Sequence, residues 1–172
     1  MRMRSNKAGD VAMFIKSELL NIYNDNEIAA LISAVFEEYA EMSKTDLIIY
    51  ADKCINESVL IKINDAVRLL KNEYPFQYIT GKKYFLNCII NVNPSTLIPR
   101  PETEELTDLI IKDCVKKNIL SPSVIDIGTG SGCIAVALKK NKINADVTAI
   151  DISKDALTTA MNNALLNDVA ID

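Results

Sequence analysis

A strand, a glycine-rich loop, a helix and a second strand are predicted in succession between Val124 and Asp151. An apolar run, 124–127, leads directly into Gly128-Thr129-Gly130-Ser131-Gly132, and helical spacing begins at Cys133. The next apolar run, 146–150, ends at Asp151. Open α/β sheets bind ligands at the carboxyl ends of their strands, so the loop and the carboxylate should lie together. We therefore predict a nucleoside site in which an acidic side chain holds a ribose.

The spacing of the glycines indicates which nucleoside this is. A dinucleotide fingerprint, G-x-G-x-x-G, needs its third glycine at 133, where this chain has Cys133. The pattern present is D-x-G-x-G-x-G, beginning at Asp126, and it resembles motif I of the class I S-adenosylmethionine-dependent methyltransferases. Such a ligand has no pyrophosphate and needs carboxylates for its ribose hydroxyls and amino group, a role that suits Asp126 and Asp151. The competing interpretation is a tight strand-to-helix turn without a ligand, and an acid at the next strand end counts against it.

Composition excludes several other classes of function. The chain has 172 residues, of which 49% are hydrophobic and 24% charged, as in a globular protein. Its net charge of -4 argues against a sequence-independent grip on nucleic acid, which requires a basic surface. No apolar stretch approaches the length of a membrane span. We expect a cytoplasmic protein that binds neither membranes nor, directly, nucleic acid.

The residues available for catalysis are limited as well. The chain has no histidine, which rules out Ser-His-Asp and Cys-His nucleophilic sites within it and most zinc arrangements. Its four cysteines form no C-x-x-C pair and are expected to be reduced thiols in the core, without a metal.

The first ~74 residues are predicted to form a small helical bundle. Apolar residues recur with helical spacing from a start near Asp10 to Tyr23, and again from a start near Asn26 to Met42. Ser43 or Thr45 is expected to cap a shorter helix and Ser58 to cap a further one. No catalytic constellation lies in this part, so residues 1–74 are interpreted as a domain for substrate recognition or scaffolding.

Pro75 interrupts the helical pattern and begins an expected linker, 75–100. Within it, 83–86 and 89–92 are predicted to form a β-hairpin that turns at Asn87-Cys88. Pro101 is expected to begin a helix that reaches about Asn118. Residues 101–172 are then the expected cofactor-binding domain.

Three blocks together give a more specific resemblance. They are Pro75-Phe76-Gln77-Tyr78-Ile79-Thr80-Gly81, Leu97-Ile98-Pro99-Arg100-Pro101-Glu102-Thr103-Glu104 and Asp126-Ile127-Gly128-Thr129-Gly130-Ser131-Gly132. They resemble the signature blocks of the HemK-type release factor glutamine methyltransferases over essentially the whole chain. The resemblance implies an α/β protein with a helical N-terminal bundle, a β-hairpin linker and the first part of a Rossmann-like class I methyltransferase domain.

The same resemblance implies an activity, a partner and site residues. The family methylates the glutamine side-chain amide in a Gly-Gly-Gln motif of class 1 peptide chain release factors. By resemblance, Gly128 to Gly132 line S-adenosylmethionine, Asp151 holds its ribose, and Leu97 to Thr103 border the cofactor pocket.

One departure from the family pattern is that the chain contains no N-P-P-Y tetrapeptide, the family's substrate-orienting motif. The 46 residues after Asp126 suffice for a strand, a helix, a strand, a helix and the start of a third strand. No catalytic residue is therefore assigned, and we expect these 172 residues alone to be inactive.

Three functions stay open at this point. The first is the release factor glutamine methyltransferase, the second a nucleic-acid adenine methyltransferase with a similar motif, and the third a non-catalytic module that binds S-adenosylmethionine. The acidic balance counts against the second.

Overall fold

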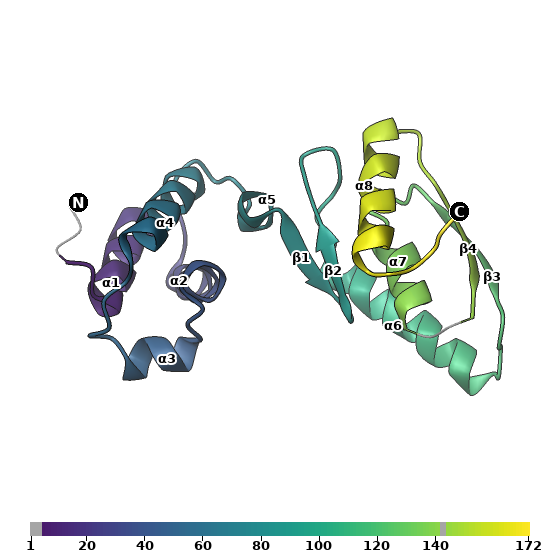
Figure 1. Ribbon diagram of the computed structural model, residues 1–172, viewed down its shortest axis with the longest axis horizontal. Helices are drawn as coiled ribbons and strands as arrows, with labels where there is room; N and C mark the ends of the chain where they lie inside the picture. Colours follow the sequence, from purple (N-terminus) through teal and green to yellow (C-terminus); the bar gives the residue numbers. More distant parts are fainter. Residues whose placement is uncertain (1–4, 142–143) are drawn as a thin grey trace. The chain divides into compact units, whose positions relative to one another are not determined.

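A computed structural model describes residues 5–141 and 144–172 and divides the chain into two compact units, Met1–Thr80 and Gly81–Asp172. Each unit is built around its own apolar core, and Figure 1 gives the order of elements in both. The helical first unit contains α1 (Ala8–Leu19), α2 (Asp25–Ala40), α3 (Lys44–Ile49), α4 (Glu57–Leu70) and α5 (Phe76–Thr80).

The core of the first unit is formed by the apolar faces of α1, α2 and α4. Side chains four residues apart turn to one face of a helix, and this repeat places Val11, Ile15 and Leu19 of α1 in the interior, fully buried. Phe36 of α2 and Ile63 of α4 are buried in the same cluster. The bundle predicted from helical spacing is therefore present, with the predicted stripes facing inward.

The helix ends differ in part from those expected. Asn24 caps α2 in a capping box with Glu27, and Ser43 caps α3 by accepting the Asp46 N–H at 3.1 Å. The prediction that Ser58 caps a helix was wrong, since α4 begins at Glu57 and its N-cap is Asn56, two residues before Ser58. The first helix is also shifted: it runs from Ala8 to Leu19, and Tyr23 lies beyond it, its hydroxyl donating to the Leu70 carbonyl at 2.9 Å.

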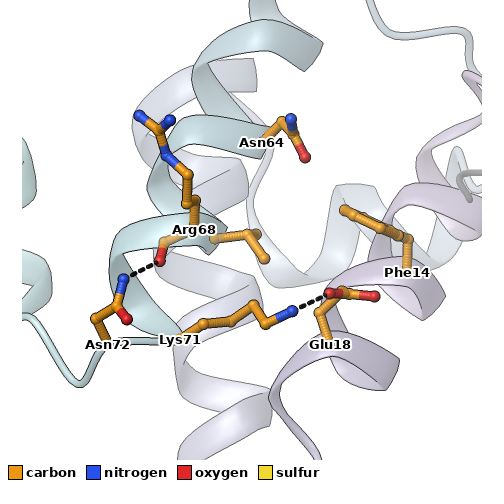
Figure 2. A pocket seen from close by; sticks show the side chains of 7 residues that line it. Phe14, Glu18, Asn64, Arg68, Lys71 and Asn72 are labelled. Atoms are coloured by element: carbon orange, nitrogen blue, oxygen red, sulfur yellow. Dashed lines mark hydrogen bonds and ion pairs between the residues drawn. The ribbon is translucent and has the colours of Figure 1, made fainter. Parts of the chain in front are cut away.

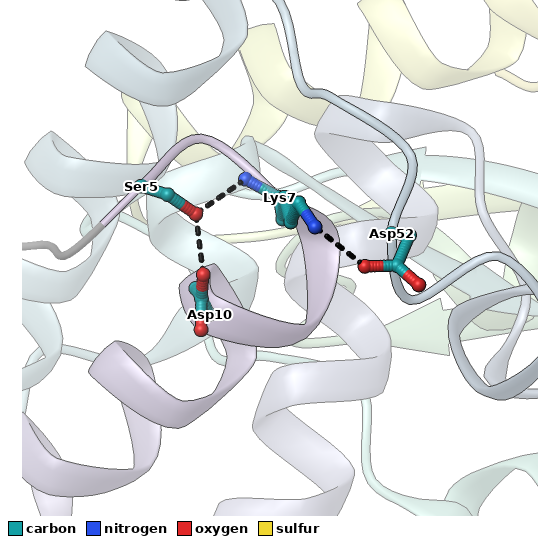
Figure 3. A network of polar contacts seen from close by, with 4 residues as sticks. All are labelled: Ser5, Lys7, Asp10 and Asp52. Atoms are coloured by element: carbon teal, nitrogen blue, oxygen red, sulfur yellow. Dashed lines mark hydrogen bonds and ion pairs between the residues drawn. The ribbon is translucent and has the colours of Figure 1, made fainter.

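The start of α1 is held by the segment that follows α3. The Ala8 and Gly9 N–H groups, which lack partners inside the helix, donate to the Lys53 and Ala51 carbonyls at 2.9 and 2.8 Å. Figure 3 shows the side chains around this junction, where Lys7 pairs with Asp52 at 2.7 Å. Hydrogen bonding to this carboxylate raises the pKa of Lys7, and the ammonium lowers the pKa of Asp52. These partners in residues 51–53 explain why the helix begins two residues before Asp10.

The short helix α5 belongs to the first unit, although Pro75 precedes it. Phe76 and Ile79 are half-buried and pack against the core that α1, α2 and α4 form. The unit consequently continues beyond residue 74, to Thr80.

The second unit begins with an antiparallel hairpin of β1 (Lys82–Phe85) and β2 (Cys88–Asn91). Phe85 pairs with Cys88, so the turn is Leu86-Asn87, and the prediction of a turn at Asn87-Cys88 was wrong by one residue. Leu86 adopts the left-handed conformation, with φ of 48°, and its N–H donates to the Glu104 carboxylate at 2.7 Å. This contact comes from a residue distant in sequence, which local turn preferences do not reveal.

The remainder of the unit is an α/β arrangement. It contains α6 (Pro101–Lys116), β3 (Ser123–Ile127), α7 (Cys133–Lys140), β4 (Asp146–Ile150) and α8 (Lys154–Leu166). The two strands are parallel, with Ser123 opposite Asp146 and Ile127 opposite Ile150. In Figure 1, the three helices and the hairpin lie on the same side of this sheet.

The core of the second unit lies between the sheet and its helices. Val147 of β4 packs with Ala135 and Leu138 of α7, and residues of α6 and β3 extend the cluster. The opposite face carries the exposed side chains Ile125, Ile127 and Ile150.

A further sheet contact lies beside β4. The Asp172 N–H donates to the Val147 carbonyl at 3.0 Å, and the Asp172 carbonyl accepts the Ala149 N–H at 2.6 Å. This is the hydrogen-bond pattern of a parallel neighbour, as expected for the start of a third strand.

Candidate functional site

The glycine loop and Asp151 lie together because they follow neighbouring parallel strands. The loop leaves β3, and Asp151 follows the last residue of β4. Backbone hydrogen bonds hold the loop across the strand ends, since the Gly128 and Thr129 N–H groups donate to the Ile150 carbonyl at 2.8 and 3.0 Å. The chemistry-bearing groups therefore stand at the carboxyl edge of the sheet, where α/β proteins bind ligands.

The Asp151 carboxylate is fixed by two backbone donors. Its Oδ1 accepts the Ser153 N–H at 2.9 Å and its Oδ2 accepts the Gly130 N–H at 2.8 Å. These hydrogen bonds lower the pKa of Asp151 below its ordinary value, and the one from Ser153 has the larger effect. The carboxylate is thus charged at neutral pH, and lone pairs on both oxygens are left for further donors.

The glycines serve two different purposes. Gly128, Gly130 and Gly132 all have positive φ, of 75°, 56° and 76°. A Cβ at Gly128 would meet nothing within 4 Å, and one at Gly130 would meet only the Gly128 carbonyl, at 4.0 Å. At Gly132, by contrast, it would stand 2.9 Å from the Ala160 Cβ of α8. The first two glycines leave the backbone open to a ligand, and the third lets α8 approach the loop.

The polar side chains of the loop, those of Thr129 and Ser131, point into the protein. The Thr129 hydroxyl donates to Asp126 Oδ2 at 2.7 Å, and the Thr129 and Ser131 side chains are buried. Asp126 is half-buried beneath the loop. Of the seven predicted site residues, Gly128 and Gly130 have open space around their backbone and Asp151 presents a carboxylate, while Thr129 and Ser131 are buried.

Sequence reasoning missed two residues of α8 that support the loop. Ala160 packs against Gly132, and the Asn163 side-chain amide donates to the Ser131 carbonyl at 2.8 Å. Asn163 is fully buried. Polar residues four apart in this helix, at 159, 163 and 167, were a visible signal of a buried polar face.

Two further features border the site in sequence. In the segment expected to line the cofactor pocket, Ile98 is buried whereas Leu97 is 71% exposed. Cys133 follows the loop directly, and burial raises the pKa of its thiol to about 11. It is therefore a neutral core thiol, as expected, whereas the expectation of a core position was wrong for Cys54, which is exposed.

The first unit carries a separate groove of about 400 Å³ between α1 and α4. Figure 2 shows that the Lys71 and Glu18 side chains meet across it, with 2.5 Å between Nζ and Oε2. Lys71 lowers the pKa of Glu18, mainly through this hydrogen bond. Phe14 and Arg68 also line the groove, which thus offers an aromatic ring and charged groups.

Two kinds of feature are absent from 5–141 and 144–172. No cluster of three or more histidine, cysteine or acidic side chains is arranged to hold a metal ion there. Within these same ranges, no helix has the length and apolar character needed to cross a membrane.

Comparison with known proteins assigns both units. Residues 15–81 match the PrmC N-terminal domain, and residues 102–172 match the methyltransferase small domain. Release factor glutamine methyltransferases from Flavobacterium psychrophilum and Bacteroides thetaiotaomicron are 42% and 38% identical to the chain, each over 89% of it and 54% of the relative. The one from Streptococcus pneumoniae is 40% identical over 83% of the chain and 50% of the relative.

The chain thus spans about half the length of the curated relatives that it matches. Between the two domain matches, residues 82–101, which include the β1–β2 hairpin, are unmatched. By sequence, the chain is similar to the release factor glutamine methyltransferases, and its helical first unit and βαβ glycine loop agree with this similarity.

Proposed function

We propose that this chain forms the recognition unit and the cofactor-binding half of an enzyme that methylates release factors. The methyl group would move from S-adenosylmethionine to the side-chain amide nitrogen of the glutamine in the Gly-Gly-Gln motif, and the amide would lose a proton. The observation that carries the proposal is the charged Asp151 beside the open backbone of Gly128 and Gly130, in a chain whose relatives bear this activity in their names.

The residues at the loop fit S-adenosylmethionine. The missing side chains at Gly128 and Gly130 leave room for a ligand to touch the backbone. Asp151 is a ready acceptor for two ribose hydroxyls, and Asp126 supplies a second carboxylate near the start of the loop. When bound, the cofactor supplies an activated methyl group on a sulfonium centre. The chain's own contribution is to bind and orient it, a large part of catalysis when the nucleophile is a weak amide.

The partner would be a class 1 peptide chain release factor. Residues 1–74, together with α5, form a unit without a glycine loop, and the aromatic and charged groove on it suits a protein surface. A net charge of -4 supports a protein substrate in preference to nucleic acid. An enzyme with this substrate would work in the cytoplasm, where translation terminates.

Calorimetry and methyl transfer test the proposal separately. We expect the chain to bind S-adenosylmethionine and S-adenosylhomocysteine but not NAD, since the dinucleotide glycine pattern is broken at Cys133. A protein that extends this chain to the length of its relatives should transfer labelled methyl to a release factor and not to an adenine-containing DNA duplex. Labelling of the DNA alone would favour the adenine methyltransferase, and cofactor binding without any transfer would favour a non-catalytic module.

A further inference from the structure

Two side chains of α8, Thr159 and Asn163, and that of its C-cap residue, Asn167, form a ladder of contacts along the outer edge of β2 and the residues just after it. Val92 donates its N–H to the Gly81 carbonyl next to β1, and alternate residues of a strand face opposite neighbours. Ile89 and Asn91 therefore turn their backbone groups away from β1, toward α8. The ladder pairs Asn167 with Ile89, Asn163 with Asn91, and Thr159 with Asn93.

The two asparagines bond to the strand as another strand would. Asn163 Oδ1 accepts the Asn91 N–H at 2.8 Å, and its Nδ2 donates to the Asn91 carbonyl at 2.9 Å. Asn167 repeats the pattern on Ile89, at 3.1 and 2.8 Å. The spacing permits this because four helical residues rise about 6.0 Å and two strand residues about 6.7 Å. The edge of β2 is thereby closed by side-chain amides.

Only one member of the ladder also reaches the glycine loop. Asn163 uses its second Nδ2 hydrogen for the Ser131 carbonyl at 2.8 Å, whereas Asn167 Nδ2, at the C-cap of α8, donates to the Asn163 carbonyl. Asn163 is fully buried, so water cannot replace any of these partners without opening the packing. Three hydrogen bonds thus join one amide to both the hairpin and the loop.

We propose that Asn163 is a positioning residue of the cofactor loop and that it couples the loop to the hairpin. Through the Ser131 carbonyl it fixes the turn in which Gly132 donates to the Thr129 carbonyl at 2.8 Å. The Gly130 N–H that meets Asp151 lies within the same turn. Because the hairpin directly follows the helical unit in the chain, this amide links the segment after the recognition unit to the cofactor site. The inference rests on the proposed role of the loop in binding S-adenosylmethionine.

The decisive comparison is between Asn163→Asp and Asn167→Asp, both in the full chain. Each variant keeps the shape of the side chain, loses its donors and weakens the same edge of β2, but only Asn163→Asp removes the hydrogen bond to Ser131. By calorimetry with S-adenosylhomocysteine, we expect Asn163→Asp to weaken binding by about tenfold or more, and Asn167→Asp by no more than about twofold. Equal losses in the two variants, or none in Asn163→Asp, would overturn the proposal.

A measurement on the unaltered chain covers the case in which Asn163→Asp does not fold. Coupling is reciprocal, so a ligand that stabilises the loop should also stabilise the hairpin edge. Saturating S-adenosylhomocysteine should lower the hydrogen-exchange rate of the Asn91 N–H severalfold and leave the exchange rate of the Ile15 N–H, in the first unit, unchanged. An unchanged Asn91 rate despite measured binding would refute the coupling alone. A complete lack of binding by the unaltered chain would remove the proposed function and this inference together.

Discussion

The Asp151 carboxylate accepts the Gly130 N–H at 2.8 Å, joining the acid at the end of β4 to the middle of the loop that leaves β3. One group therefore has two roles, since it orders the loop and remains an acceptor for a ligand. Because Asp126 instead holds the Thr129 hydroxyl, the two acids of the site act on different parts of the loop.

Replacing Asp151 should separate these roles. Asp151→Asn keeps an oxygen acceptor for the loop but loses the charge, while Asp151→Ala loses both. We expect Asp151→Ala to weaken the binding of S-adenosylmethionine by at least about tenfold, because charge-assisted hydrogen bonds contribute about 1.5–3 kcal/mol each. Asp151→Asn should show an intermediate loss of affinity. Calorimetry measures both, and unchanged affinity in Asp151→Ala would refute the ribose assignment.

The titration of Asp151 gives an independent check. Its pKa is lowered in the folded chain, so its hydrogen bonds stabilise the fold above the ordinary carboxyl pKa of 3.8. That contribution is lost as the pH falls through the lowered value. A carboxyl NMR titration should place the Asp151 midpoint below 3.8, and Asp151→Asn should make stability less dependent on pH in this acid range. A midpoint above 3.8 would contradict the backbone contacts.

The glycines of the loop should differ in their tolerance of alanine. Gly128→Ala incurs only the left-handed backbone cost of about 1–2 kcal/mol, because the space around it is open. Gly132→Ala adds a clash with Ala160 at 2.9 Å and should cost about 2–4 kcal/mol. Urea denaturation of the two variants gives the comparison, and the matched φ values make the first a control for the second. Equal destabilisation would mean that α8 moves away easily.

The first unit should fold by itself, and α5 should add to its stability. Residues 1–80 are expected to show a cooperative helical melt, since their core is complete within that range. Residues 1–74 lose the packing of Phe76 and Ile79 and should be less stable by about 1–3 kcal/mol. Circular dichroism during thermal unfolding tests both, and equal melting curves would place the boundary at Pro75.

The exposed face of the β3–β4 sheet should make the chain associate with itself. Ile125, Ile127 and Ile150 are 58%, 75% and 43% exposed on one face. Ile125→Lys should reduce the association seen by sedimentation velocity. Ile61→Lys is the matched control, because Ile61 is also 58% exposed but lies on α4 of the first unit. A chain that stays monomeric at all concentrations, or equal effects of both substitutions, would refute the role of this face.

Local sequence patterns were enough to predict most features whose cause is local, although not the cap of α4. Helical periodicity predicted the bundle, and the apolar run before Asp151 predicted an acid at a strand end. Cys133 in place of the third glycine distinguished the loop from a dinucleotide-binding loop. The order of the units followed from the same signals, because periodicity, capping and glycine spacing depend on neighbours a few residues away.

Features that depend on residues distant in the chain became apparent only from the packing of the elements. The Leu86-Asn87 turn is supported by Glu104, the first unit continues to Thr80 because α5 reaches the bundle core, and Asn163 meets Asn91 across 72 residues. A buried amide is stable only when all its partners are placed together, and no local pattern specifies partners on another element. The polar spacing at 159, 163 and 167 indicated a buried polar face, but the partners of Asn163 in the hairpin and the loop became evident only in the packed structure.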